Sequence, residues 1–284
     1  MNKDYIELEN GMFMHQKCYD SDWSLCQSCF IKPGHHKGSY DRLYCQKCHN
    51  QIVAEENISL HNEYVLDLLE RNGFTGLREA NIPVSIVAEE NMSIIKNDLN
   101  FFQKIMVSIA VSIFDFDLSA PLNGVTQDSF KKGYFSRLFT GNKEKECTIE
   151  IIENLPEIDF RATLAHEYLH AWMMVNNDIF TYYNNLTTSP PGIEWSSQFH
   201  YGDQFTEGFA EIGTYLALND ANTSSIKINY ELDQKDEFTY GEGYRIIKVC
   251  LDYHGLDSLI YKALNKEPFP CFEQPLLFQN KLNN

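Results

Sequence analysis

The sequence has few basic residues relative to acidic ones. It carries 23 Lys and Arg against 40 Asp and Glu, a formal net charge of −17 at pH 7. Nucleic acids and anionic membrane surfaces are bound through clustered Lys and Arg. We therefore expect neither as a partner. The acid excess is compatible with basic substrates, and equally with a role in solubility alone.

Long hydrophobic runs are also absent. The longest, Ile105–Phe114, has about half of the roughly 20 residues that span a bilayer, so we expect a core helix or a buried strand there. The first ten residues contain no apolar stretch after a basic start, which predicts no secretory signal and a cytoplasmic protein. In that compartment cysteines stay reduced unless a metal holds them.

Internal repeats and low-complexity linkers are missing as well. The 284 residues are 43% hydrophobic, which is enough for a sizeable core. Residues 1–55 are rich in cysteine and poor in apolar periodicity, whereas the rest of the chain alternates helical and strand patterns. We expect two units, a small cysteine module over residues 1–55 and a larger domain over residues 56–284.

The larger domain is predicted to mix helices and strands in an α+β fold. Asn57 or Ser59 is a plausible cap for a helix that ends near Gly73, and Asp159 for a second helix. Residues 177–203 are rich in Asn, Ser, Thr and Pro, which predicts a long loop. The remaining expected elements are strands over 82–89 and 146–156 and helices over 160–176 and 205–218.

Five of the eight cysteines lie within residues 18–48, and four of these form two CxxC pairs, Cys26 with Cys29 and Cys45 with Cys48. Fifteen residues separate the pairs. This spacing is typical of a structural zinc site with four thiolate ligands. A redox pair or four free cysteines fit the pattern less well. His15 and Cys18 lie upstream without a partner pair, and we expect them to bind no metal.

The stretch LAHEYLHAWM places His166 and His170 four residues apart, with Glu167 beside the first histidine. On a helix, two such histidines lie on one face and can bind one Zn²⁺. Glu167 would then act as general base towards a water activated by the metal. A pair of ordinary helix histidines is the alternative interpretation of the bare motif.

A catalytic zinc needs a third protein ligand. The stretch FTEGFAEIGTYLAL offers Glu207 and Glu211, one turn apart on one helix face. Glu211 would orient a histidine, or lie in solvent as an ordinary helix carboxylate. His200 is a rival third ligand.

Together these motifs resemble a known family, the LIM-domain metallopeptidases of plants that restrain organ growth (the "DA-one" family) and, more closely, their shorter bacterial relatives. The resemblance covers roughly residues 20–270. It rests on the stretches IPVSIVAEENM, GVTQDSF, IENLPEIDFRATLAHEYLHAWM, FTEGFAEIGTYLAL and YGEGYRIIKVCLDYHGLDSLIYKAL, in that order.

The resemblance implies a gluzincin-like peptidase domain, with an antiparallel or mixed sheet and active-site helices, behind a LIM-like zinc module. His166, His170 and Glu207 match the family's zinc ligands, and Glu167 matches its catalytic glutamate. Tyr240 matches a tyrosine of the family's C-terminal signature and is our candidate to stabilise the oxyanion, ahead of Tyr244 and His254; a packed aromatic is the alternative. Two zinc ions are implied, one catalytic and one structural.

The chain also departs from the family. The ubiquitin-interacting segments and the first half of a full LIM domain are missing, so dependence on ubiquitin is not implied. Thirty-six residues separate His170 from Glu207, more than is usual in the family. We expect the predicted loop over 177–203 to border the cleft, where it would gate access or select substrate.

The sequence therefore predicts a zinc metallopeptidase that hydrolyses protein or peptide substrates. The alternative is an interaction or scaffold protein in which the zinc module binds a partner and the peptidase-like domain is inactive. The sequence does not separate endopeptidase from aminopeptidase activity.

Overall fold

The structure is a computed structural model. It describes residues 5–7, 13–15, 26–30, 32, 34–39, 42–88, 149–176, 179–184, 201–223, 228, 240–267 and 269. For residues 180, 181, 184, 201–204 and 240–242, and in the two N-terminal strands, it describes the backbone alone. The predicted apolar segment Ile105–Phe114 and the GVTQDSF motif lie outside this part of the chain.

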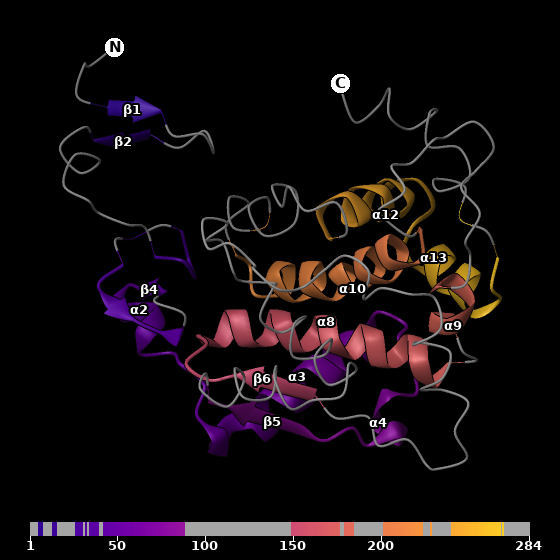
Figure 1. Ribbon diagram of the computed structural model, residues 1–284, viewed down its shortest axis with the longest axis horizontal. Helices are drawn as coiled ribbons and strands as arrows, with labels where there is room; N and C mark the ends of the chain where they lie inside the picture. The colour runs from indigo at the N-terminus through magenta and orange to yellow at the C-terminus, as the bar shows by residue number, and fades with distance from the viewer. Residues whose placement is uncertain are drawn as a thin grey trace, which may run out of the picture.

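Three long helices form the centre of the molecule. In Figure 1, α8 (Glu157–Val175), α10 (Tyr201–Asp220) and α12 (Tyr240–His254) lie in successive layers, and α10 contacts both of the others. The shorter helices α9 (Ile179–Asn184) and α13 (Leu256–Leu264) lie near one end of the stack. Helix α10 is thus covered on two sides, which explains why most of its length is buried.

A two-stranded parallel pair covers another side of α8. Strand β5 (Val84–Val87) pairs with β6 (Ile149–Ile152) in the register Val84 to Ile149. Three isoleucines of β6 are buried, because β6 also contacts α8. Antiparallel pairs join β1 (Tyr5–Glu7) to β2 (Phe13–His15) and β3 (His36–Lys37) to β4 (Leu43–Tyr44). The described part of the chain is therefore a mixed helix and strand structure, and mostly helical.

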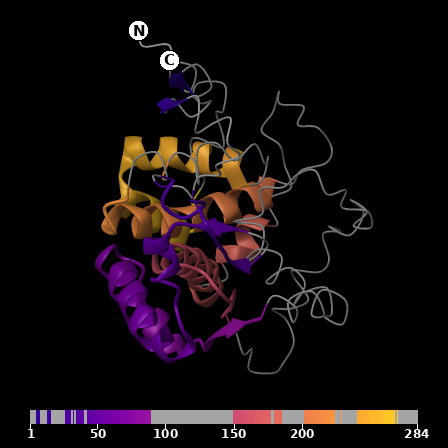
Figure 2. The ribbon, with the colours of Figure 1, turned by 90° about the vertical axis from the view of Figure 1, so that its left-hand side faces the viewer.

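Helix α3 (Ile58–Arg71) packs against α8, as the second view shows (Figure 2). Arg161 of α8 donates to Nδ1 of His61 at 3.1 Å and lies over the ring of Tyr64 at 3.8 Å. The predicted helix after Asn57 is confirmed, with its apolar face buried. The elements next to it are η2 (Glu55–Asn57), α4 (Leu77–Ala80) and, in the cysteine module, α2 (Gln46–His49).

Aromatic side chains fill the core between α8 and α10. The indole of Trp172 stacks on Phe209 with 5.9 Å between ring centroids, and Phe74 meets Trp172 edge-on at 5.2 Å. All three are at most 1% exposed. These contacts join α8 to α10 within the buried core.

No helix in the described part of the chain is both long and apolar enough to cross a membrane.

Two glycines of α10 allow its backbone to approach the neighbouring helices. A Cβ on Gly213 would lie 2.6 Å from the carbonyl carbon of Ala165 in α8, and a Cβ on Gly208 would lie 2.9 Å from Cα of Gly243 in α12. Neither contact leaves room for a side chain. Helix α10 therefore packs closely on both neighbours at positions that only glycine can occupy.

The predicted loop over 177–203 is wrong in its described parts. Residues 179–184 form α9, and α10 begins at Tyr201, four residues before the expected start. Tyr183 is 1% exposed, stacks on Phe205 at 3.8 Å and donates to the carbonyl of Glu267 at 2.7 Å. Burial of the aromatic residues in this segment outweighs its turn-forming composition, so its first part is packed structure rather than a gate.

The start of α8 was also predicted wrongly. The helix begins at Glu157, and Asp159 is a buried residue of the first turn rather than the N-cap. The cap residue is Pro156, which makes no side-chain cap, and the backbone N–H of Glu157 donates to the carbonyl of Gln51. A distant chain segment therefore takes the place of the expected cap.

One cysteine differs from the expected reduced state. Cys250, in α12, is 1% exposed and disulfide-bonded. The four cysteines of the CxxC pairs form no disulfide bonds. The expectation that every cysteine outside a metal site is reduced is wrong for Cys250, because three scattered cysteines give no sequence signal for a pairing.

We predict that Gly213→Ala destabilises the protein more than Gly76→Ala. The methyl group at 213 would meet the backbone of Ala165, so we expect a loss of about 3 kcal/mol in the free energy of unfolding. Gly76 has a positive φ but nothing within 4 Å of its Cβ position, so its substitution should cost about 1 kcal/mol. Urea unfolding of both variants measures the difference, and equal losses would contradict the close contact.

Candidate metal centres

Helix α8 places the two motif histidines side by side. His166 and His170 lie one turn apart, are 0% and 2% exposed, and have their Nε2 atoms 3.0 Å from each other. Almost every residue of α8 from Phe160 to Met173 is buried, so these histidines are inside the helix stack and not on its surface. Two imidazole nitrogens that face each other at this distance share one position for a proton or a cation.

Helix α10 supplies a carboxylate to the same position. Oε2 of Glu207 lies 3.2 Å from Nε2 of His170 and 3.3 Å from Nε2 of His166. The Glu207 side chain is 12% exposed. The structure thus brings together His166, His170 and Glu207, whose ligand atoms form a group that can hold a metal ion.

The donor set and its spacing fit zinc. Ligand atoms at the usual Zn–N and Zn–O distances in a tetrahedral shell are about 3.3 Å apart. The three measured separations of 3.0, 3.2 and 3.3 Å are close to this value. Two imidazoles and a carboxylate make three protein ligands, which is the number found at catalytic zinc sites with a fourth position for water or substrate.

The charge of the site also favours a cation. Glu167, Glu207 and Glu211 are carboxylates that lie around two histidines in a buried space. Burial lowers the pKa of His166, but Glu211 and the other carboxylates outweigh it and raise the pKa to about 10. Burial raises the pKa of Glu207, but His170 and His166 lower it to about 2. Buried carboxylates stay ionised only where positive charge lies nearby, and a divalent metal ion supplies such charge.

Glu167 is a buried carboxylate next to the histidine pair. It follows His166 directly, is 2% exposed, and neither carboxylate oxygen has a hydrogen-bond partner in the described part of the chain. Burial raises the pKa of Glu167 to about 7, although His166 and His170 act to lower it. Buried carboxylates are normally hydrogen-bonded, so this one is held ready for a partner that enters the site.

Glu211 lies behind the first histidine. Its Oε2 atom is 3.6 Å from Nδ1 of His166, while Nε2 of the same ring faces His170 and Glu207. A carboxylate on this side favours the tautomer with the proton on Nδ1, which leaves Nε2 as the ligand atom. The structure places Glu211 at the position where it can orient His166, and the alternative of a solvated carboxylate is wrong because its side chain is 1% exposed.

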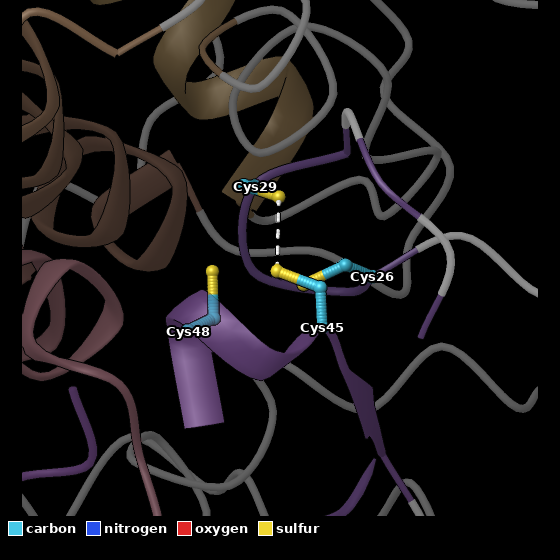
Figure 3. A group of neighbouring side chains, drawn as sticks. All are labelled: Cys26, Cys29, Cys45 and Cys48. Atoms are coloured by element: carbon cyan, nitrogen blue, oxygen red, sulfur yellow. Dashed lines mark hydrogen bonds between the residues drawn. The ribbon is translucent and has the colours of Figure 1, made fainter. Parts of the chain in front are cut away.

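The second centre is the cluster of Cys26, Cys29, Cys45 and Cys48 (Figure 3). Their Sγ atoms all lie within 4.8 Å of one another, and those of Cys29 and Cys45 are 3.9 Å apart. Sulfur atoms around a tetrahedral zinc are about 3.8 Å apart. The four cysteines therefore form a group that can hold a metal ion, in an arrangement that closes the coordination shell.

Local structure brings the two CxxC pairs together. The hairpin of β3 and β4 leads into Cys45, and α2 then carries Cys48. Gly38 is required here because a Cβ would enter the ring of Tyr44, which is fully buried beside the cysteines. The hydrogen bond with Cys26 raises the pKa of the Cys48 thiol well above its usual range. Ionised thiolates at this spacing need a cation between them.

The remaining predicted residues are described only in part. Tyr240 is the first residue of α12, and its side chain lies outside the described structure. Tyr244 is buried and His254 is exposed at the end of the same helix. His200 and Cys18 lie outside the described residues, and only the backbone of His15 is described.

Sequence reasoning missed Gly208 and Gly213, which set the position of Glu207 and Glu211. The sequence did contain a signal for them: two glycines five residues apart in a helical pattern destabilise a helix, so their presence indicates close packing at those positions. Their partners, Gly243 and Ala165, lie on other helices and have no sequence signal that links them to α10.

In comparisons with known proteins, the chain matches no family model, no curated protein and no solved structure. Any assignment of function therefore rests on the residues themselves and on their geometry.

We predict that Glu211→Gln weakens metal binding at the histidine site by about 10- to 100-fold, because His166 loses the carboxylate that orients it. The measurement is a competition titration of the purified protein with a chromophoric chelator. Asp252→Asn is the matched control, since Asp252 is an exposed carboxylate on α12 that pairs with Lys248. An unchanged affinity in Glu211→Gln would show that Glu211 does not act on the ligand.

Proposed function

We propose that the chain is a zinc-dependent metallopeptidase of the gluzincin type that hydrolyses protein or peptide substrates. The observation that carries the proposal is the buried triangle of His166, His170 and Glu207 with the unpartnered carboxylate of Glu167 beside it. A site with three ligands and a free base is suited to hydrolysis by activated water. A purely structural metal site would have four protein ligands and no need for the base.

His166, His170 and Glu207 would hold the ion, with Glu211 orienting His166. When bound, zinc supplies a Lewis acid that polarises the scissile carbonyl and acidifies water. Glu167 removes a proton from the attacking water as the oxygen forms its bond to the carbonyl carbon. The same carboxyl group then gives that proton to the amide nitrogen as the C–N bond breaks, so Glu167 returns to its starting state.

Tyr240 is the proposed donor to the oxyanion. It begins α12, whose Gly243 contacts Gly208 of α10. Gly208 follows Glu207 directly, so the first turn of α12 lies on the helix layer next to the site. This packing supports a role for Tyr240 that the resemblance first suggested.

The resemblance to LIM-domain metallopeptidases supports the same proposal. The two candidate metal centres occur in the order that the resemblance implies, a cysteine module followed by the histidine helix. In this proposal the zinc of the cysteine module is structural and stabilises a unit with few other buried residues. Because acidic residues outnumber basic ones, we expect neither a nucleic acid nor an anionic membrane surface as a partner of the enzyme.

We predict that Glu167→Gln lowers hydrolysis of a casein or peptide-library substrate by about 100- to 10,000-fold while the zinc content stays unchanged. The amide keeps the shape of the side chain and loses the base. Glu157→Gln is the control on the same helix, because that side chain pairs with Arg161 and not with the histidines. Equal activity of Glu167→Gln and wild type would reject the proposed mechanism and favour the scaffold alternative.

A further inference from the structure

The cysteine module contacts the turn that leads into the histidine helix. Ser39, in the loop between β3 and β4, donates its hydroxyl to the carbonyl of Glu153 at 3.0 Å and accepts from Nδ2 of Asn154 at 3.3 Å. Ser39 is 3% exposed, and Glu153 lies 114 positions further along the chain. These bonds join the tip of the module to the end of β6.

A second contact follows the last cysteine. The segment after Cys48 runs antiparallel to residues 155–157: Val53 donates its N–H to the carbonyl of Leu155 at 3.0 Å, and Glu157 donates its N–H to the carbonyl of Gln51 at 2.8 Å. The first amide of α8 is thus satisfied by a carbonyl of another chain segment. Helix starts need such a partner, and α8 has no side-chain cap of its own.

The turn between β6 and α8 receives two of these hydrogen bonds from the module. Asn154 has a φ of 61°, in the left-handed region that a residue with a side chain adopts at some cost. Ser39 bonds to the side chain of Asn154 and to the carbonyl of the residue before it. The module therefore contributes two hydrogen bonds to the turn that sets the direction of α8, beside the bond that the N–H of Glu153 donates to the carbonyl of Val87 in β5.

The two segments that make these contacts, the loop with Ser39 and the segment with Gln51, are close in sequence to cysteines of the cluster. The loop of Ser39 leads through β4 to Cys45, and Gln51 is three residues after Cys48. The buried centre of the module consists of its cysteines and Tyr44, with Ile52 partly buried against it. A module with so small a core depends on its metal for order, so both contact segments should depend on it as well.

We infer that the cysteine module anchors the start of α8 and thereby couples the two metal centres: occupation of the cysteine site fixes the helix that carries His166, Glu167 and His170. Ser39 is the positioning residue of this coupling. The effect on hydrolysis rests on the proposed function, whereas the effect on metal affinity does not. Coupling between two binding sites is reciprocal, so metal at the histidine site should also stabilise the cysteine site.

The test is Co²⁺ binding to the full chain, because thiolate-bound and histidine-bound cobalt have different absorption spectra. Ser39→Ala should weaken Co²⁺ binding at the histidine site by about 2- to 10-fold. Ser39→Thr, which keeps the hydroxyl, should restore it. Cys45→Ser/Cys48→Ser should weaken it further, by about 5- to 150-fold. Gln46→Ala is the control, since Gln46 bonds to His36 and Asn50 within the module and not to the turn.

Wild-type affinity at the histidine site in both Ser39→Ala and the double cysteine variant would overturn the inference. If a variant unfolds, or if the histidine site of the wild type binds no cobalt, amide hydrogen exchange in α8 replaces cobalt binding as the measurement. Faster exchange in the first turns of α8 in Ser39→Ala, but not in Gln46→Ala, supports the anchor even if the proposed peptidase function fails. Unchanged exchange in α8 would reject it.

Discussion

The close approach of α8 and α10 is the constraint on which the candidate site depends. The histidines come from one helix and Glu207 and Glu211 from the other, and the two backbones meet where Gly213 lies against Ala165. A side chain there would push the helices apart, and a metal site tolerates displacements of only a few tenths of an ångström. The aromatic stack of Trp172 and Phe209 joins the same two helices, so packing of the core and assembly of the site are one event.

The two metal centres differ in a way that predicts different roles. The cysteine cluster supplies four ligands and leaves no position for a substrate, whereas the histidine site supplies three and has an unpartnered carboxylate beside it. Closed sites stabilise structure, and open ones perform chemistry. The hydrogen bonds of Ser39 with the turn before α8, and the bond that the N–H of Glu157 donates to the carbonyl of Gln51, give the closed site a physical route to the open one.

The sequence predicted those parts of the structure that depend on local spacing. His166 and His170 lie on one helix face because they are four residues apart, and the CxxC spacing brought the four cysteines together. Glu207 was chosen by resemblance, and the structure places it beside both histidines. The helix after Asn57 and the two strands β5 and β6 followed from their apolar patterns.

The sequence could not predict features that depend on tertiary contacts. The start of α8 is capped by the carbonyl of Gln51, more than a hundred residues away, so Asp159 was wrongly expected to cap it. The helix α9 forms because Tyr183 packs on Phe205, although its neighbours favour turns. The gluzincin fold itself stays a prediction, as do the role of Tyr240 and the division at residue 55.

Zinc per chain is the measurement that tests the account most directly. It should be determined in the purified wild type and in the double variant His166→Ala/His170→Ala. We expect two zinc ions in the wild type and one in the variant, since the cysteine cluster keeps its own ion. One zinc ion in both proteins would show that the histidine helix holds no metal, and the peptidase proposal would then be wrong.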